Sequence, residues 1–333
     1  MSEYTVVREG GAGLIDLSSR GRIRVSGSEA TMFLNGLITN DMKTLAENRW
    51  MPAAFPNVQG RLMGAVRVVR GVDSADKKPE FLIDTDPESH ESVLKTIARF
   101  TLAGDFHVSD VTTETALLTI QGKRAVEVVE KVFETSISDL PHNGVVKLEW
   151  QNAPVIIIRA THTAEDGFDI LIDSAHAAKV RQVLTDAGAE PVGQDALEIL
   201  RVEAGIARFG RDMDETNVVT ETNLDDAVSY TKGCYVGQEI IVRIRHRGHV
   251  AKKLTGLRFQ TDHRIEAGTT IKSADDKEIG KVTSTAFSPG LGSTIGLGYV
   301  RYEYLEAGTS VSVDHETATI TDLPFIRGSW YQN

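Results

Sequence analysis

The single cysteine of the chain lies in the segment that is best equipped for chemistry. Cys234 sits between Gly233 and Tyr235 in TKGCYVGQEIIVRIRHRGHV, residues 231–250, and Lys232 lies two positions before it. Two glycines predict a tight backbone that holds the thiol where another molecule can approach it. A nearby cation favours the thiolate, which is the reactive form. The alternative is a small core residue in a glycine turn, and the local composition does not decide between the two.

A row of cations follows this cysteine. Arg243, Arg245, Arg247 and His249 recur at every second position, so a strand here would display them as a comb on one side. Residues 241–258 contain six Lys or Arg side chains and no acid. Such a comb would bind a polyanionic small molecule or an RNA phosphate. The alternative is that the arginines pair with acidic residues at a domain interface.

A carboxylate on an expected helix is the third chemical candidate. Residues 195–204 place Leu200 and Ala204 on an apolar stripe, and Glu203 flanks that stripe. A buried carboxylate must find partners, and it suits a ligand that offers two adjacent N–H donors. The alternative is an internal salt bridge with Arg208 or another cation.

Composition limits what these residues can do. The formal net charge of −11 opposes general binding to nucleic acid or anionic lipid. One cysteine permits no intrachain disulfide or CxxC zinc site, and it cannot alone hold an iron–sulfur cluster. Residues 1–11 carry no signal or transit pattern, and the longest apolar run, residues 154–160, has only strand length. We therefore expect a cytoplasmic protein with no metal site and no membrane span, whose lone thiol fits a reducing compartment.

Hydrophobic periodicity predicts mixed strands and helices around these candidates. Residues 21–27 alternate as a strand with Ile23 and Val25 on one face. Ser26 and Glu29 have capping-box spacing before an apolar helical stripe that ends at Leu37.

Two later segments look alike. Residues 81–100 and 169–188 each run through a strand, an aspartate, a turn and an amphipathic helix. This likeness suggests two related βα units, although units of this kind commonly resemble each other.

The helical period disappears from Lys253 onward. Short alternating runs separated by Gly, Pro and acidic turns are typical of a small antiparallel barrel. We place a domain boundary there, which divides the chain into residues 1–250 and 251–333.

The motif KGCYVGQE, Lys232 to Glu239, resembles the signature of the YgfZ family of folate-binding proteins. GLIDLSSRGRIRVSG, FLNGLITND, RVEAGIARFGRDMDETN and the barrel region resemble segments of the glycine-cleavage aminomethyltransferase (T protein). The resemblance covers essentially the whole chain. It implies an α+β fold of the GcvT/YgfZ type, with two mixed α/β lobes around a central folate channel and a C-terminal antiparallel β-barrel.

The same resemblance implies residue roles. Cys234 would be the functional thiol, with Lys232 beside it, and Glu203 would match the glutamate that contacts the pterin in the aminomethyltransferase. The remaining folate-binding candidates come from the motif, from the ITND segment beside the channel and from the cation row: Tyr235, Gln238, Glu239, Asn40, Asp41 and Arg243.

One departure separates the two branches of this resemblance. The aminomethyltransferase carries an acidic pair in a segment similar to NVQGRLMGA, residues 57–65, where this chain has Gly64 and Ala65. Without that carboxylate, stabilisation of the charge that develops on the amine and folate is lost.

The resemblance therefore leads us to expect a protein that binds tetrahydrofolate or a derivative and supports iron–sulfur cluster assembly or repair, including that of tRNA-modifying enzymes. Its partners would be iron–sulfur enzymes or cluster-assembly proteins. The alternative is a folate-dependent aminomethyltransferase, which would need an acid such as Asp41 near the folate. A third possibility is an RNA-binding module that uses the cation comb, and the global acidity opposes it.

Overall fold

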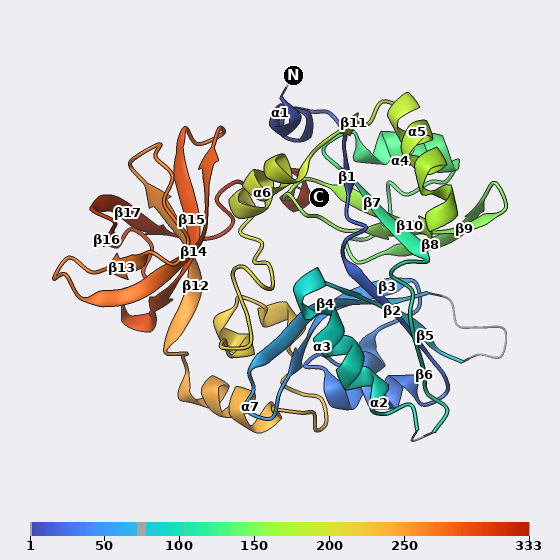
Figure 1. Ribbon diagram of the computed structural model, residues 1–333, viewed down its shortest axis with the longest axis horizontal. Coiled ribbons are helices and arrows are strands. Elements are labelled where there is room, and N and C mark those ends of the chain that lie inside the picture. Colours follow the sequence, from blue (N-terminus) through green and yellow to red (C-terminus); the bar gives the residue numbers. More distant parts are fainter. Residues whose placement is uncertain (1, 72–77, 103, 333) are drawn as a thin grey trace.

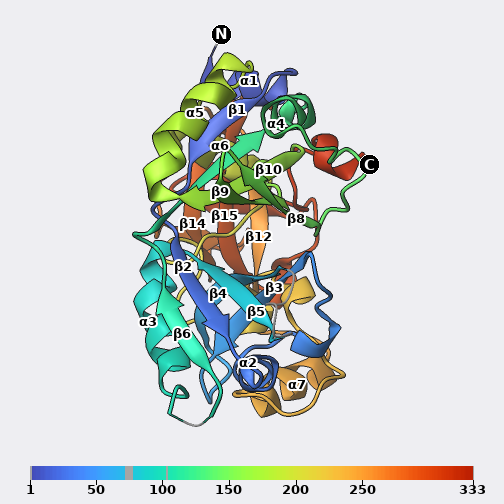
Figure 2. The same cartoon turned by 90° about the vertical axis from the view of Figure 1, so that its right-hand side faces the viewer.

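The computed structural model describes residues 2–71, 78–102 and 104–332. Two open β-sheets and a closed barrel are arranged around the helix α6 (Gln194–Glu203), which lies near the middle of the molecule (Figure 1). Figure 2 shows the lobes of the two open sheets stacked one on the other, with the barrel behind them. This arrangement confirms the expected α+β class with two mixed lobes and an antiparallel barrel.

The first lobe contains a six-stranded sheet. Its strands lie in the order β11 (Glu190–Pro191), β1 (Gly13–Asp16), β7 (Thr115–Gln121), β10 (Gly167–Asp173), β9 (Ala153–Arg159) and β8 (Val145–Trp150). The apolar sides of α4 (Ala125–Phe133) and α5 (Ala177–Asp186) pack into one core with this sheet. The short helix α1 (Glu3–Arg8) and α6 share a second core with β1, β7 and β10.

The second lobe contains a five-stranded sheet. Its strands lie in the order β3 (Arg49–Pro56), β4 (Leu62–Arg70), β5 (Glu80–Thr85), β2 (Gly21–Ser26) and β6 (His107–Asp110). The helices α2 (Ala30–Leu37) and α3 (Pro87–Ala98) supply buried side chains to its core. The predicted strand at 21–27 is confirmed, because Ile23 and Val25 are both fully buried in β2.

The expected capping box before α2 is wrong. Glu29 is itself the N-cap residue and makes no side-chain cap, because its carboxylate accepts a hydrogen bond from the backbone N–H of Asp105 at 2.9 Å. The two look-alike segments do fold as strand and helix, as β5 with α3 and as β10 with α5. They lie in different sheets, one in each lobe.

The barrel closes through six strands. Their order is β12 (Lys252–Phe259), β15 (Ser293–Arg301), β14 (Glu278–Ser288), β13 (Thr270–Lys272), β16 (Ser310–Val313) and β17 (Glu316–Thr321). Leu257, Val300 and Ile320 belong to its own core, whereas Ile295 and Leu297 pack with Val202 of α6. Alternate residues of β15 therefore stabilise the barrel and attach it to the lobes.

The cation row forms a helix, so the expected comb is wrong. The helix α7 (Gln238–Arg247) begins after Gly237, whose φ is 76°, and ends at Gly248, whose φ is 90°. Acid in its first turn and base in its last turn match the helix dipole, and this local chemistry prevails over the period-two pattern. Arg243 and Arg247, four positions apart, are exposed on one side of this helix, whereas Arg245, two positions from each, lies on another side.

Candidate functional site

A cavity of about 270 Å³ lies where the two lobes meet α6 and the segment that follows it. Its walls combine apolar, aromatic and charged side chains from both lobes. The lining residues include Arg20, Trp50, Ala65, Arg67, Asp84, Asp86, His162, Glu198 and Arg201. A concave site of mixed character at the junction of lobes is the usual place for a small-molecule ligand.

Arg67 holds the two lobes together across this cavity. Its Nη2 donates to Asp169 Oδ2 at 2.6 Å, from the other lobe, and lies 2.9 Å from Asp84 Oδ2, which is its cross-strand neighbour on β5. Arg20 continues the chain of charges, because it contacts Asp84 Oδ1 at 2.7 Å and Asp86 Oδ1 at 2.6 Å. Buried charges persist only when paired in this way.

One donor in this network is unused. The Nε of Arg67 is buried and has no hydrogen-bond partner among the described residues. The guanidinium carbon lies 5.6 Å from the centre of the Trp50 ring, and both side chains line the cavity. An unpaired buried donor costs about 1–3 kcal/mol. A flat heterocycle with a ring carbonyl or nitrogen would supply the missing acceptor and could stack on the indole.

A carboxylate and an imidazole form a pair in the same wall. His162 Nε2 lies 3.0 Å from Oδ1 and 3.1 Å from Oδ2 of the fully buried Asp169. Burial favours a raised pKa for Asp169, but the charges and hydrogen bonds of His162 and Arg67 outweigh it and hold that pKa well below the usual range. Asp169 is therefore an anion that orients the His162 ring beside the cavity.

The helix α6 contributes a further carboxylate. Glu198 is paired with Arg201 of the same helix, whose Nε lies 2.9 Å from Oε2, and with Arg211 Nε at 3.2 Å. Burial would raise the pKa of Glu198, but these guanidinium groups lower it below its normal value. Arg201 is also paired with Asp212 and donates to Ser284 of the barrel at 2.6 Å. Glu198 thus presents a carboxylate to the cavity from a fixed position.

The departure noted in the sequence falls in the cavity wall. Gly64 and Ala65 are adjacent on β4, so their side chains point to opposite faces. A Cβ added at Gly64 would lie 2.7 Å from Val93 Cγ2 of α3, whereas Ala65 lines the cavity. Of these two positions, only 65 could present an acid to a ligand, and here it carries a methyl group.

The residues expected from the sequence lie elsewhere. Cys234 is exposed, which excludes the reading of it as a core residue. It is not among the residues that line the cavity, so the structure does not place the thiol beside a ligand there. The other candidates do not line the cavity either; they are Asn40, Asp41, Glu203, Lys232, Tyr235, Gln238, Glu239 and Arg243.

The ammonium group of Lys232 is bound by backbone carbonyl oxygens. Its ammonium donates to the carbonyl oxygens of Asn35 at 2.6 Å, Ile38 at 2.9 Å and Asn40 at 2.6 Å, and it lies 5.0 Å from the centre of the Tyr235 ring. All three of its donors are therefore used near the end of α2. Burial lowers the pKa of Lys232 to about 8. The expectation that this ammonium serves the Cys234 thiol is not supported by these contacts.

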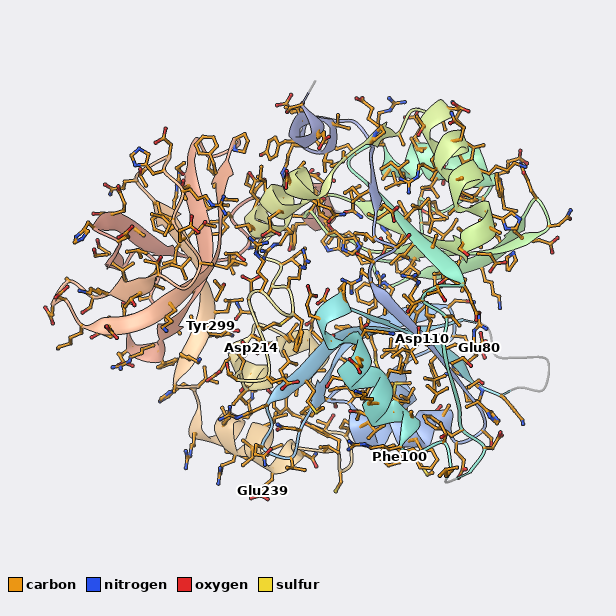
Figure 3. The ribbon with its side chains drawn as sticks, viewed as in Figure 1. Glu80, Phe100, Asp110, Asp214, Glu239 and Tyr299 are labelled. Atoms are coloured by element: carbon orange, nitrogen blue, oxygen red, sulfur yellow. The ribbon has the colours of Figure 1, made fainter. Side chains whose placement is uncertain are left out.

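Among the remaining candidates, Asn40, Asp41 and Gln238 have hydrogen-bond partners within the fold, whereas the buried hydroxyl of Tyr235 has none among the described residues. Asn40 donates from Nδ2 to Pro52 O at 2.8 Å and Asp226 O at 3.0 Å, and Asp41 accepts from Lys43 N at 3.0 Å. Burial raises the pKa of Tyr235 to about 12. Gln238 donates to Gly233 O at 3.4 Å, and Glu239 lies on the outer side of α7 (Figure 3).

Glu203 joins the N-terminal helix to the barrel. It is 0% exposed, and it accepts hydrogen bonds from Tyr4 Oη at 2.9 Å, Arg8 Nη2 at 2.8 Å and Ser288 Oγ at 2.5 Å. The salt bridge left open in the sequence exists, with Arg8 in place of Arg208. Glu203 does not line the cavity, so its expected contact with a pterin has no support in this geometry. Glu198, five positions earlier on α6, does line it.

Arg67, Asp84 and Asp169 are not among the site residues that the sequence predicts, because no short motif joins them. A signal did exist: charged residues interrupt apolar strand sequence at each of these positions. A strand residue of this kind must be paired or functional if it is buried.

Comparison with known proteins gives matches along nearly the whole chain. The family profile described as GCVT N-terminal domain matches residues 1–232, and that of the glycine cleavage T-protein C-terminal barrel domain matches residues 252–326. The aminomethyltransferase of Rubrobacter xylanophilus is 32% identical over 329 residues, which cover 98% of this chain and 86% of that protein. The aminomethyltransferase of Thermotoga neapolitana is 30% identical over 342 residues, covering 98% and 89%.

A solved structure shares the fold. The crystal structure of glycine cleavage system aminomethyltransferase T from Bartonella henselae superposes with a TM-score of 0.88 at 24% identity, covering 98% of this chain and 89% of that one. Among the described residues, no helix has the length and apolar character needed to cross a bilayer. The same part of the chain holds no group of three or more His, Cys, Asp or Glu arranged as a metal site.

Proposed function

The chain belongs to the glycine cleavage T-protein family, and from that premise we propose that it binds tetrahydrofolate or a derivative in the cavity lined by Trp50 and Arg67. The unpaired Nε of Arg67 is the observation that carries this proposal. A pterin ring offers an acceptor for that donor, a flat face for the indole and N–H donors for a carboxylate. Every residue that lines the cavity lies within 1–250, which we propose as the folate-binding unit, with 251–333 as the barrel unit.

Calorimetry with tetrahydrofolate tests this proposal through two glutamates of one helix. Glu198→Gln removes a cavity carboxylate and should weaken binding by about tenfold or more, because it loses a charged hydrogen bond to the pterin. Glu203→Gln is the matched control, and it should leave the affinity within about twofold of wild type. Absence of binding by the folded wild-type protein, or the reverse order of the two variants, would contradict the proposal.

Aminomethyl transfer is the activity that the comparisons favour. Relatives that are 32% and 30% identical over nearly the whole chain carry that name. Although position 65 is alanine, Asp84, Asp86 and Glu198 line the cavity and could stabilise charge beside a bound folate. Asp41, the acid considered from the sequence, does not line it. A glycine-cleavage reconstitution assay should then give folate-dependent turnover.

Support of iron–sulfur proteins is a second candidate function, and two observations favour it. The alanine at position 65 removes an acid from the cavity wall, and Cys234 is displayed on the surface within the motif that resembles the YgfZ signature. An exposed thiolate could attack a disulfide of a cytoplasmic partner protein, which forms a mixed disulfide and releases the partner's other sulfur as a thiolate, or it could be one ligand of a cluster shared with that partner.

The two functions differ in their dependence on the thiol. Under the second function, a deletion strain carrying Cys234→Ser should not recover iron–sulfur enzyme activity, although the variant folds. Under the first function, the same variant should retain turnover in the reconstitution assay. Full rescue by Cys234→Ser at equal protein level would eliminate the second candidate.

A further inference from the structure

A second cavity lies between the barrel and the segment that follows α6. Its volume is about 560 Å³, which falls within the range of about 300–1,000 Å³ that is typical of ligand pockets. Residues 211–217 form one wall, and strands β14 and β15 of the barrel form another. It shares Met213 with the cavity between the lobes and is otherwise lined by different residues. We call it the barrel cavity.

Tyr299 brings an unpaired hydroxyl group to this cavity. Tyr299 lines the cavity and is only 6% exposed, and its Oη is buried with no hydrogen-bond partner among the described residues. Burial and the charges of Asp212, Glu221 and Asp214 raise its pKa, so the group stays protonated. Tyr299 and Asp214 lie close together where the barrel faces the segment after α6 (Figure 3). The carboxylates favour a ligand that places a cationic N–H donor beside the hydroxyl oxygen.

Asp214 has an oxygen available for the same donor. Its Oδ1 accepts hydrogen bonds from the backbone N–H of Thr216 at 2.8 Å and from the Thr216 hydroxyl at 2.6 Å. Its Oδ2 has no partner within the described part of the chain. An ammonium group in this corner would therefore contact Tyr299 Oη and a carboxylate oxygen together.

Three cations lie on the strands around Tyr299. Cross-strand pairing sets Arg301 of β15 opposite Lys252 of β12, and it sets Tyr299 opposite Lys281 of β14. All four residues line the barrel cavity. Like charges directly opposite each other destabilise a sheet, and none of the three cations has an ion pair among the residues that the structure describes. A carboxylate bound beside them would reduce this repulsion.

The charges around the barrel cavity balance. The three cations face an equal number of acids that have no ion pair among the described residues: Asp214, Glu221 and Glu278. The other two ions of the wall, Arg211 and Asp212, belong to a chain with Glu198 and Arg201 that contains two acids and two cations. A pure anion or a pure cation would therefore meet charges of its own sign, whereas a zwitterion can place each end beside the opposite charge.

We propose that the barrel cavity binds a free α-amino acid with an apolar side chain. The ammonium group of the ligand donates to Asp214 and to Tyr299 Oη, and its carboxylate accepts from Lys281 and Arg301 in charge-assisted hydrogen bonds. Met213 and Ala267 supply apolar contacts for the side chain of the ligand. The site is separate from the proposed folate site, so neither proposal depends on the other.

Three related ligands test the need for both charges. Calorimetry at neutral pH with the full-length protein would compare L-leucine with 4-methylpentanoate, which lacks the ammonium group, and with 3-methylbutylamine, which lacks the carboxylate. We expect L-leucine to bind at least about tenfold more tightly than either analogue, because each analogue loses charged hydrogen bonds. Failure of L-leucine to bind wild type, or equal binding of the three ligands, would overturn the inference.

Removing a single oxygen atom locates the site. Tyr299→Phe should weaken L-leucine binding by about tenfold and should affect 4-methylpentanoate little. The melting temperature should not fall, because the Tyr299 hydroxyl has no hydrogen bond to lose among the described residues. Tyr302→Phe, at an exposed barrel position outside the cavity, is the matched control and should bind L-leucine as wild type does.

Tetrahydrofolate binding keeps this inference apart from the proposed function. Tyr299→Phe should leave the affinity for tetrahydrofolate within about twofold of wild type. An unchanged affinity of Tyr299→Phe for L-leucine would overturn the inference. Wild type that binds tetrahydrofolate but not L-leucine would refute this inference alone, whereas L-leucine binding without tetrahydrofolate binding would refute only the folate site.

Discussion

Some residues whose types suggest a role in catalysis or ligand binding instead make structural contacts within the protein. Lys232 and Glu203 both lie in segments that resemble functional motifs, yet their polar atoms are occupied by carbonyl oxygens and by Arg8, Tyr4 and Ser288. Residue type and spacing showed that these groups need partners. They could not show which partner, because Arg8 and Glu203 are 195 positions apart.

Lys232 gives a stability prediction with a defined pH dependence. Replacement by Met should lower the unfolding free energy by about 1–3 kcal/mol at pH 7, because the carbonyls of Asn35, Ile38 and Asn40 lose their donor. Burial depresses the folded pKa from 10.5 to about 8. Between these values the unfolded chain binds more protons, so this group makes wild-type stability rise with pH in that window.

Urea unfolding of wild type and Lys232→Met from pH 7 to 10 would check this expectation. The stability of wild type should increase relative to that of the variant above about pH 8. A difference between the two proteins that stays constant over the whole range would show that the lysine keeps its proton in the folded state.

At the scale of elements, the periodicity of the sequence predicted strands correctly where buried and exposed residues alternate. It predicted β2 and the antiparallel barrel, whose interior and exterior residues alternate along each strand. It failed at α7, where a period-two pattern of arginines lies between two glycines with positive φ. Helix-end chemistry is a stronger local signal there than alternation, even though Ile240, Val242 and Ile244 alternate with the cations.

Gly237 supports a prediction about how α7 is attached. Its φ is 76°, and an added Cβ would lie 2.4 Å from the carbonyl oxygen of Asn57 in the turn between β3 and β4. Gly237→Ala should therefore destabilise the protein by more than about 1 kcal/mol, through backbone strain and the lost contact with that turn. Thermal unfolding would measure the effect.

Gly233 provides the control within the same motif. An added Cβ there meets nothing within 4 Å. Gly233→Ala should change the melting temperature little. Equal destabilisation by both variants would mean that the motif needs flexible backbone in general, and the close approach of Gly237 to Asn57 would not be the cause.

At the scale of the whole molecule, the candidate site could not be read from local sequence. The cavity forms where strands β4 and β5 of one lobe face the segment between β9 and β10 of the other, and Arg67 and Asp169, which join the two lobes beside it, are 102 positions apart. Family resemblance predicted a cavity between lobes, and the fold bears out the lobes and the barrel. The residues that line the cavity became visible only when the two sheets were placed together.

The contact between Arg67 and Asp169 should control how the two lobes unfold in acid. His162 and Arg67 hold the pKa of Asp169 below its ordinary 3.8 against the effect of burial. A depressed carboxyl pKa contributes stability that is present above the unfolded value and lost as pH falls below it. Wild type should therefore lose unfolding free energy steeply below about pH 4.

Asp169→Asn should be less stable by about 3–5 kcal/mol at pH 7, because it leaves buried cations short of a partner, and its stability should depend less on acid. Asp139→Asn, at an exposed position, should follow wild type. Urea titrations at pH 7 and at pH 3.5 would measure all three proteins, and a parallel acid response in wild type and Asp169→Asn would show that the lobes are held by other contacts.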